Sequence, residues 1–273
     1  MNRTPTLIFT ALILGCGGGY KSPTVTAPPP PPPPPPVKQA QWALVWADEF
    51  DAAALDTTNW IPVNGASNVN NERQYYTPSD VYLENGSLVL RSQVRAFGGR
   101  GFTSGEVRTG TKRTVGIGSA VEWRTQIPVG KGMWPANWLV NTPCDGINGC
   151  GGNWPPEIDV MEIRGSVPNN NLMTHWWGSY PAQGHQTTEY SFVTLSAGYH
   201  TYRVEWFADS LIWYIDGAQA AKHTSNVTAG NLQLVMNTAV GGDFDGNPDE
   251  TTTFPQYHRV DYVRVYRDTA NFH

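Results

Sequence analysis

The sequence predicts an all-β protein: a curved β-sandwich of the jelly-roll type, formed as a single domain over residues 40–273. Many short segments of this region alternate apolar and polar residues and are rich in Val, Ile, Trp and Tyr, as strands with one buried face are. No convincing stretch with the helical period is longer than about two turns. The concave face of such a sandwich can form a groove long enough for a chain molecule.

Five segments carry the strand pattern most clearly, and two turn signals accompany them. Asp209-Ser210 separates two of the segments and is typical of a tight hairpin, while Asp216-Gly217 is a second turn signal. The segments are residues 87–94, 120–127, 201–208, 211–216 and 259–266.

The composition favours a neutral, hydroxyl-rich ligand. The net charge is -5, and the chain has no basic run, which argues against binding to nucleic acid. The chain has 11 tryptophans and 12 tyrosines, which are high numbers for a chain with only 15% charged residues. Aromatic rings stack on the apolar faces of sugars, so a carbohydrate suits this composition; the alternative is that most of the rings belong to the core.

Residues 1–15 have the features of a bacterial lipoprotein signal peptide. One Arg is followed by an apolar run at residues 7–14, which is too short to span a bilayer. The run ends in ILGC, residues 13–16, which resembles the box in which the Cys receives a lipid. We therefore expect an exported bacterial protein that a lipid on Cys16 anchors to a membrane. With an ordinary signal peptide cut nearby, the protein would instead be secreted and Cys16 would have no role.

Residues 16–39 are expected to be a linker. Nine consecutive prolines, Pro28 to Pro36, predict a polyproline II segment because each proline fixes φ and lacks a backbone donor. Such a run extends about 28 Å and would hold the domain away from a membrane. A linker without any special role is the alternative.

Cys144 and Cys150 remain as a pair if Cys16 carries a lipid. They lie in the glycine-rich segment PCDGINGC, residues 143–150, of a chain that we expect to be exported. A disulfide is therefore expected, with a contribution of about 2 kcal/mol for so small a loop. Two cysteines without a nearby His make a poor zinc site.

The segment EIDVMEI, residues 157–163, places three acids where strict alternation would not. If Glu157 and Asp159 face a groove, an uninterrupted strand would turn Glu162 into the core. A buried, unpaired carboxylate costs several kcal/mol. One extra residue near Val160 or Met161, a β-bulge, returns Glu162 to the groove. The sequence thus predicts a bulged strand with three acids on one face.

Three acids on one face suit the cleavage of a glycosidic bond. A retaining glycosidase uses one ionised and one protonated carboxyl group, about 5–5.5 Å apart. Asp159 lies between Glu157 and Glu162 and can separate their pKa values through its charge. The alternative is a solvent-facing strand that is acidic by accident.

The segment EIDVME resembles the catalytic signature of glycoside hydrolase family 16 in its bulged form, which laminarinases and agarases carry. Eight further segments of residues 42–266 match the family in its order. They are VWADEF, NNERQYYT, TSGEVRT, GKGMWPANWLV, HTYRVEW, IWYIDG, LVMNTAVGG and DYVRVY. The resemblance implies a concanavalin A-like jelly roll that hydrolyses internal β-1,3-glucosidic bonds of laminarin-type β-glucans with retention, and mixed-linkage glucan as a further substrate.

The resemblance also implies roles for individual residues. Glu157 becomes the nucleophile, Glu162 the acid/base, and Asp159 the residue that assists between them. The expected binding residues are Asn70, Glu72, Arg108, Trp134, Trp138, His175 and Asn237.

The binding residues are expected to act in different ways. Trp134 and Trp138 would stack on sugar rings, with core packing as the alternative. Arg108 and Asn70 would bind hydroxyl groups on the non-reducing side, and Glu72 would do the same or orient Arg108. His175 matches a family residue on the leaving-group side, although a lone His is more often structural, and Asn237 would face the groove.

No cofactor is expected for catalysis, but many members of the family bind a structural calcium. Glu49, Gly86 and Asp261 are the nearest matches to that site, which would add stability without entering the chemistry. Two departures from the family pattern border the groove. Phe244 stands where family members often have Trp, and the loop at residues 143–156 is longer than the simplest form, so the resemblance leaves product size open.

Three other functions remain open. A glucan-binding lectin or sensor could use the same aromatic residues, although it would not need all three acids. A transglycosylase shares the glycosyl-enzyme intermediate with a hydrolase. An agarase-like galactan hydrolase is the third. In each case we expect a monomer that binds a polysaccharide, without nucleic acid, and that meets a membrane only through its lipid anchor.

Overall fold

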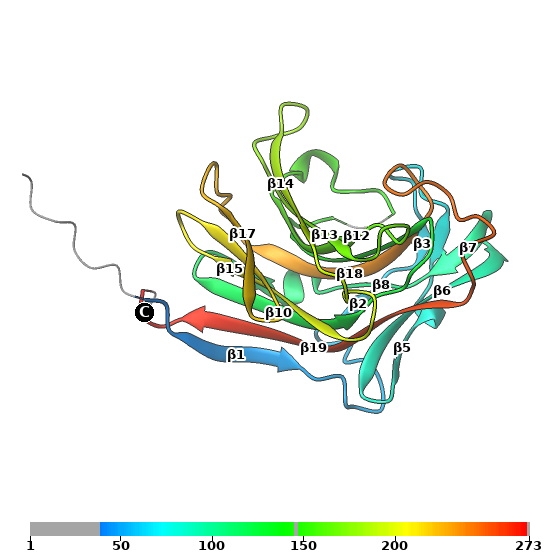
Figure 1. Ribbon diagram of the computed structural model, residues 1–273, viewed down its shortest axis with the longest axis horizontal. Helices are drawn as coiled ribbons and strands as arrows, with labels where there is room; N and C mark the ends of the chain where they lie inside the picture. The colour runs from blue at the N-terminus through cyan, green and yellow to red at the C-terminus, as the bar shows by residue number, and fades with distance from the viewer. Residues whose placement is uncertain (1–38, 145–146, 272–273) are drawn as a thin grey trace, which may run out of the picture. The chain divides into compact units, whose positions relative to one another are not determined.

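Two β-sheets packed face to face form the domain (Figure 1). The computed structural model describes residues 39–144 and 147–271, and residues 38–273 make up one compact unit. The predicted signal peptide, Cys16 and the polyproline segment lie outside the described residues.

The larger sheet has 11 strands and is antiparallel except between β4 and β7. β1 pairs with β19 and β5 pairs with β6 beside the main path of this sheet. The main path runs β17 (Ala218–His223), β16 (Leu211–Ile215), β15 (His200–Trp206), β10 (Ser119–Gln126), β19 (Gln256–Asp268), β6 (Ser87–Phe97), β7 (Arg100–Ser104), β4 (Gln74–Tyr76) and β3 (Gly65–Ala66), with β1 at Trp42–Asp48 and β5 at Val81–Glu84.

The smaller sheet has 8 strands and carries the acidic segment near its middle. Its path runs β14 (Gly184–Ser191), β13 (Asn170–Trp177), β12 (Glu157–Ile163), β11 (Met133–Val140), β18 (Leu232–Val240), β8 (Glu106–Arg108) and β2 (Ile61–Pro62), with β9 (Thr114–Val115) beside β18. In Figure 1, β12, β13 and β18 lie above β10 and β19 of the larger sheet.

The helical segments of the described chain are three short 3₁₀ turns: η1 (Pro78–Asp80), η2 (Gly110–Lys112) and η3 (Gly151–Asn153). Among the described residues, no helix has the length and apolar character needed to cross a membrane.

The core lies between the sheets and combines many aliphatic side chains with a few large aromatic ones. Trp60, Trp123, Trp206 and Trp213 are all fully buried. All nine residues of β18 are buried, which fits a central strand covered on both faces. The predicted all-β sandwich is therefore confirmed.

The predicted strands and turns are also confirmed, with small differences at their ends. β6, for example, continues to Phe97, past the predicted end at residue 94. Asp216 and Gly217 have φ angles of 50° and 77°, so they form the two-residue turn with left-handed conformation that joins β16 to β17.

Candidate active site

A β-bulge in β12 brings the three acids to one face. Asp159 pairs with Trp138 of β11, but the next residue of β11 toward its start, Asn137, pairs with Met161, so β12 contains one extra residue, Val160. The register against β13 shifts at the same place, between Asp159 and Glu162. Val160 and Met161 are both buried in the core. The predicted bulge is therefore confirmed, because two consecutive side chains turn inward and the next acid returns to the outer face.

The acids lie in a cleft of about 790 Å³ over the smaller sheet. Its floor is made by alternate residues of neighbouring strands, as expected for one face of a pleated sheet. These residues are Glu157, Asp159 and Glu162 of β12, Trp134, Ala136 and Trp138 of β11, Leu172, Thr174 and Trp176 of β13, and His185 and Thr187 of β14.

Each glutamate accepts a hydrogen bond from a different indole group. Trp154 Nε1 donates to Glu157 Oε2 at 3.1 Å, and Trp134 Nε1 donates to Glu162 Oε1 at 3.0 Å. A hydrogen bond that reaches a carboxylate favours its ionised form. The two bonds therefore also fix the direction in which each carboxyl group points.

Burial raises the pKa of all three acids. The pKa of Glu157 rises to about 8 because of burial and the charge of Glu162. Burial likewise raises the pKa of Glu162 to about 7, against the effects of Trp134 and Arg164. The pKa of Asp159 lies well above its usual range because of burial and the charges of both glutamates. Near neutral pH the site therefore holds protonated and ionised carboxyl groups together, which acid and nucleophilic chemistry require.

Asn70 and Glu72 also line the cleft and belong to the segment between β3 and β4. Glu72 Oε1 accepts from Asn70 Nδ2 at 3.1 Å, and Glu72 Oε2 accepts from Ser67 at 2.8 Å and Gln74 at 2.6 Å. Burial raises the pKa of Glu72 despite these bonds. The Glu72 carboxylate thus orients Asn70. Its hydrogen-bond partners are Ser67, Asn70 and Gln74, and Arg108 is not among them.

Trp138 and Asn237 form part of the same cleft and contact each other. Trp138 Nε1 donates to Asn237 Oδ1 at 2.9 Å, and Asn237 Nδ2 donates to the Tyr76 hydroxyl at 2.9 Å. Trp138 also packs on the apolar cluster around Cys144 and Val235. Its position beside the acids agrees with the prediction, while its indole N–H and the Asn237 amide are held by protein partners.

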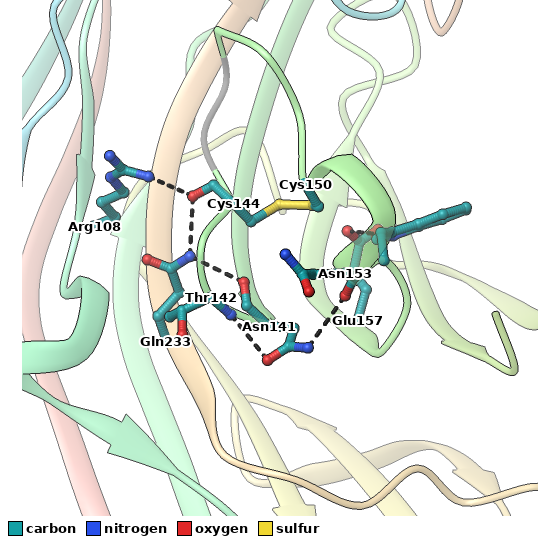
Figure 2. The surroundings of a disulfide bond; sticks show 9 residues. Arg108, Asn141, Thr142, Cys144, Cys150, Asn153, Glu157 and Gln233 are labelled. Atoms are coloured by element: carbon teal, nitrogen blue, oxygen red, sulfur yellow. Dashed lines mark hydrogen bonds between the residues drawn. A yellow bond between two sulfur atoms is a disulfide. The ribbon is translucent and has the colours of Figure 1, made fainter. Parts of the chain in front are cut away.

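Arg108 is not among the residues that line the cleft, and its predicted contact with the sugar stays a prediction. Its Nη1 donates to the carbonyl oxygen of Cys144 at 2.6 Å, as Figure 2 shows. Gln233 Nε2 donates to the same carbonyl at 3.0 Å. Arg108 points to this carbonyl because the loop after β11 passes within hydrogen-bond distance of its guanidinium. Arg108 therefore holds the loop that borders the cleft.

His175 points into the interior, so the prediction that it contacts the leaving group is corrected. It pairs with Ile158 across the strands and shares the core face, where it is fully buried. Its Nδ1 lies 2.9 Å from His223 Nδ1, and its Nε2 lies 3.2 Å from the Ser225 carbonyl oxygen. By alternation, the next residue, Trp176, lies in the cleft.

The predicted disulfide between Cys144 and Cys150 is confirmed (Figure 2). Both cysteines line the cleft, together with Asn148 and Gly149 of the same loop. The Asn68 backbone N–H donates to the carbonyl oxygen of Ile147 at 2.9 Å. The loop thus reaches from the end of β11 to the segment that carries Asn70.

The carboxylates of the predicted calcium site are paired with arginine side chains, and the calcium site stays a prediction. Both carboxylate oxygens of Glu49 accept from Arg264 at 2.9 Å, and Asp261 accepts from Arg124 at 2.6 Å. Gly86 lies in the turn between β5 and β6 with φ at 72°. Within residues 39–144 and 147–271, no group of three or more His, Cys, Asp or Glu could hold a metal ion.

Several aromatic residues that line the cleft have no site role that the sequence predicts: Tyr76, Trp154, Trp176, Tyr180 and His185. Phe244, which is expected at the border of the groove, lines the cleft as well. Alternation along β13 indicates that either His175 or Trp176 faces outward, but only the register with β12 decides between them. Trp154 precedes Glu157 by three residues in a loop, where no periodicity applies.

A jelly roll with three acids and several aromatic side chains in one cleft defines a carbohydrate-cleaving enzyme of the glycoside hydrolase class. The sequence model of glycosyl hydrolases family 16 matches residues 65–264. The chain belongs to this family.

Individual relatives agree with this assignment. The chain is similar to glucan endo-1,3-beta-glucosidase A1 of Niallia circulans, at 33% identity over 82% of this chain and 38% of that protein. It is similar to the beta-glucanase of Rhodothermus marinus, at 30% identity over 84% of this chain and 87% of the relative. The solved endo-beta-1,3-glucanase of Pyrococcus furiosus superposes with a TM-score of 0.75 at 29% identity, covering 84% of this chain and 96% of that one.

Proposed function

We propose that the protein is a retaining endo-β-1,3-glucanase that hydrolyses internal bonds of laminarin-type β-glucans, with mixed-linkage glucan as a further substrate. The observation that carries the proposal is the bulge at Val160, which places Glu157, Asp159 and Glu162 in one cleft. The names of the relatives from Niallia circulans and Pyrococcus furiosus, both β-1,3-glucanases, support this substrate.

The first step forms a covalent intermediate. The carboxylate of Glu157 attacks the anomeric carbon of the sugar, and Glu162 donates its proton to the departing glycosidic oxygen. The bond between the anomeric carbon and that oxygen breaks, and an ester between Glu157 and the sugar forms. The part of the glucan beyond the broken bond leaves with a new hydroxyl group.

The second step releases the sugar. Glu162, now ionised, takes a proton from water, and the resulting oxygen attacks the anomeric carbon. The ester to Glu157 breaks and the carboxylate is regenerated. Two displacements at the same carbon retain the configuration.

Asp159 allows Glu157 to be ionised within a buried group of acids. Its pKa is raised well above the usual range by burial and by the charges of Glu157 and Glu162. A neutral Asp159 adds no negative charge beside the nucleophile, whose ionised form accepts the hydrogen bond of Trp154. We assign Asp159 as the residue that keeps a proton while Glu157 reacts.

The cleft offers rings and amides for the remaining sugars. Trp134, Trp138 and Trp176 are partly exposed beside the acids and suit stacking on sugar rings. Asn70 is exposed in the cleft, and its side-chain amide donates to Glu72. These residues would fix the chain so that one glycosidic oxygen lies beside Glu162.

Product analysis on four polysaccharides tests the proposal. Laminarin should yield oligosaccharides of mixed length from the start of the reaction, as internal cleavage does, and mixed-linkage glucan should be cut more slowly. Cleavage of agarose or carrageenan in place of laminarin would make the protein a galactan hydrolase. Products longer than the starting oligosaccharide would indicate a transglycosylase, and binding to laminarin without cleavage would indicate a lectin.

We also propose that the protein is exported, anchored by a lipid on Cys16 and active as a monomer; the sequence supports the anchor. Cys16→Ser should move the protein from the membrane fraction to the soluble fraction of the cells. Unchanged membrane association would remove the anchor. Light scattering of the domain in solution should give the mass of one copy.

A further inference from the structure

A second aromatic ring covers one face of Trp134. Phe244, which follows β18, stacks on the indole with 4.5 Å between ring centroids and 22° between the planes. The same indole donates to Glu162. Trp134 is partly exposed, so the face away from Phe244 is the one that a sugar can meet. The departure from the family pattern at position 244 thus lies directly behind a partner of a carboxyl group in the cleft.

The residues on both sides of Phe244 are anchored. Asp245 Oδ2 accepts from the backbone N–H of Gly132 at 2.8 Å and of Ser166 at 3.0 Å. On the other side, the Asp243 N–H donates to the Asn70 carbonyl oxygen at 2.9 Å. Phe244 is therefore held between two backbone anchors.

The backbone at the start of β11 is tightly packed, with no space for a side chain at Gly132. A Cβ added to Gly132 would lie 2.4 Å from the Pro248 nitrogen, so this backbone packs closely against the segment that carries Phe244. Gly132 has φ at 76°, which also favours glycine. The guanidinium of Arg164 lies 5.6 Å from the Phe244 ring centroid. The Phe244 ring, the Asp245 anchor and the start of β11 therefore pack together around Trp134.

We propose that Phe244 is a positioning residue of the acid/base: it holds the Trp134 indole so that the N–H stays on Glu162. This inference rests on the proposed function of Glu162. Phe244 does not touch the reacting atoms in this role, and it acts through Trp134. Asp245 supports this role, because its hydrogen bonds to Gly132 and Ser166 fix the segment that carries Phe244.

The role predicts a direction for the pH dependence. Removal of the ring lets the indole rotate, and the ionised form of Glu162 loses a hydrogen bond. The pKa of Glu162 then rises, because that bond favours the carboxylate. An acid with a higher pKa keeps its proton to higher pH, so the alkaline limb of kcat/KM moves upward, while poorer alignment lowers the rate at the optimum.

Three variants at Phe244 and Trp134, together with one control variant, separate this role from damage to the fold. Phe244→Ala should lower kcat/KM on laminarin by about tenfold, part of what a positioned general acid contributes. Trp134→Phe keeps a ring but removes the N–H, and should shift the alkaline limb in the same direction. Phe244→Trp should restore both the rate and the limb. Phe102→Ala, which breaks another aromatic pair, with Phe254 at 5.4 Å, is the matched control and should shift nothing.

An activated substrate isolates the acid. A dinitrophenyl β-laminaribioside has a leaving group that needs no proton, so Phe244→Ala should form the glycosyl-enzyme at nearly the wild-type rate. Equal losses on laminarin and on this substrate would overturn the proposal. An alkaline limb that stays in place, or that also moves in Phe102→Ala, would overturn it as well.

A titration without substrate keeps the test independent of the proposed activity. In NMR of protein labelled with ¹³C-glutamate, the apparent pKa of Glu162 should be higher in Phe244→Ala than in wild type. If wild-type protein cleaves no β-glucan, the proposed function fails while this titration still reports the positioning. If the protein is active but the titration is unchanged, the positioning role alone fails.

Discussion

Glu157 and Glu162 lie on one strand, but their hydrogen-bond partners come from different parts of the chain. Trp154 precedes Glu157 in a loop, whereas Trp134 reaches Glu162 from the neighbouring strand. The spacing of the acids is visible in the sequence because it breaks an alternation. Their partners are not visible, since strand register and loop conformation bring them together.

His175 and Arg108 illustrate the same limit. A family motif indicates that each lies near the cleft, but the face on which a side chain points depends on a register of one residue. His175 falls on the core face and Arg108 turns to a backbone carbonyl. Asn70 and Glu72, by contrast, lie in the cleft as expected.

The raised pKa values predict the pH dependence of catalysis. Because Glu157 and Glu162 influence each other's ionisation, their pKa values of about 8 and about 7 belong to the pair: below about pH 7 both hold protons, above about pH 8 both are ionised, and between these limits they share one proton. Catalysis uses the form in which that proton lies on Glu162. We expect a bell-shaped profile of kcat/KM on laminarin with its maximum between these limits. A maximum below pH 5 would contradict the burial that raises both values.

The same pKa shift predicts a gain in stability when Glu157 is neutralised. The folded-state pKa of about 8 exceeds the usual 4.5, so the folded state binds the proton more tightly. This contribution is fully present below about pH 4.5 and is lost as the pH rises through about 8. Glu157→Gln should therefore melt at a higher temperature than wild type at pH 9 and at a similar temperature at pH 4, while losing activity.

Calorimetry at both pH values checks this expectation. Glu250→Gln, at an exposed position, serves as the control and should leave the melting temperature nearly unchanged at either pH. A Glu157→Gln variant that is less stable than wild type at pH 9 would show that the charge of Glu157 is stabilised in the folded protein.

At the scale of elements, the bulged strand could be predicted and the loop before it could not. Regular alternation would have buried Glu162, and a buried carboxylate costs several kcal/mol, so the sequence itself demands an extra residue. The loop between β11 and β12 has no periodicity. The pairing of Cys144 with Cys150 could be anticipated, but the contact between Ile147 and Asn68 could not.

The position of Arg108 predicts that it acts on the glucan through this loop. Arg108→Ala should raise KM on laminarin several-fold with a small change in kcat, because the Cys144 carbonyl loses a donor and the cleft wall loosens. Replacing Cys144 and Cys150 together by Ser should raise KM in a similar way and cost about 2 kcal/mol of stability.

A double-mutant cycle distinguishes this indirect role from a direct contact. Combining Arg108→Ala with the two Cys→Ser changes should raise KM by less than the product of the separate effects, since both act on one loop. Gln233 also donates to the Cys144 carbonyl, so the loop keeps one support in the Arg108→Ala variant. Multiplicative effects on KM would instead indicate that Arg108 touches the sugar.

At the scale of the whole molecule, the larger sheet supports the catalytic strand from behind. Trp213 of β16 is fully buried between the sheets, and its Nε1 donates to the carbonyl oxygen of Asp159 at 2.9 Å. This carbonyl immediately precedes the bulge residue Val160. The sandwich class could be predicted from strand patterns, but this bond depends on how two sheets distant in sequence pack together.

The bond predicts that Trp213→Phe disturbs both stability and catalysis. Phenylalanine retains most of the apolar contact but leaves the Asp159 carbonyl without this donor, at a cost of about 1–3 kcal/mol. The backbone beside the bulge then loses the hydrogen bond that holds it in place, so kcat on laminarin should fall. Trp206→Phe is the matched control, because Trp206 is equally buried and its Nε1 donates to the Thr228 carbonyl at 3.0 Å, at a residue outside the cleft lining. Denaturant unfolding should show similar losses of stability for both variants, whereas only Trp213→Phe should lower kcat; equal kcat values would mean that the larger sheet supports the fold without holding the acids in place.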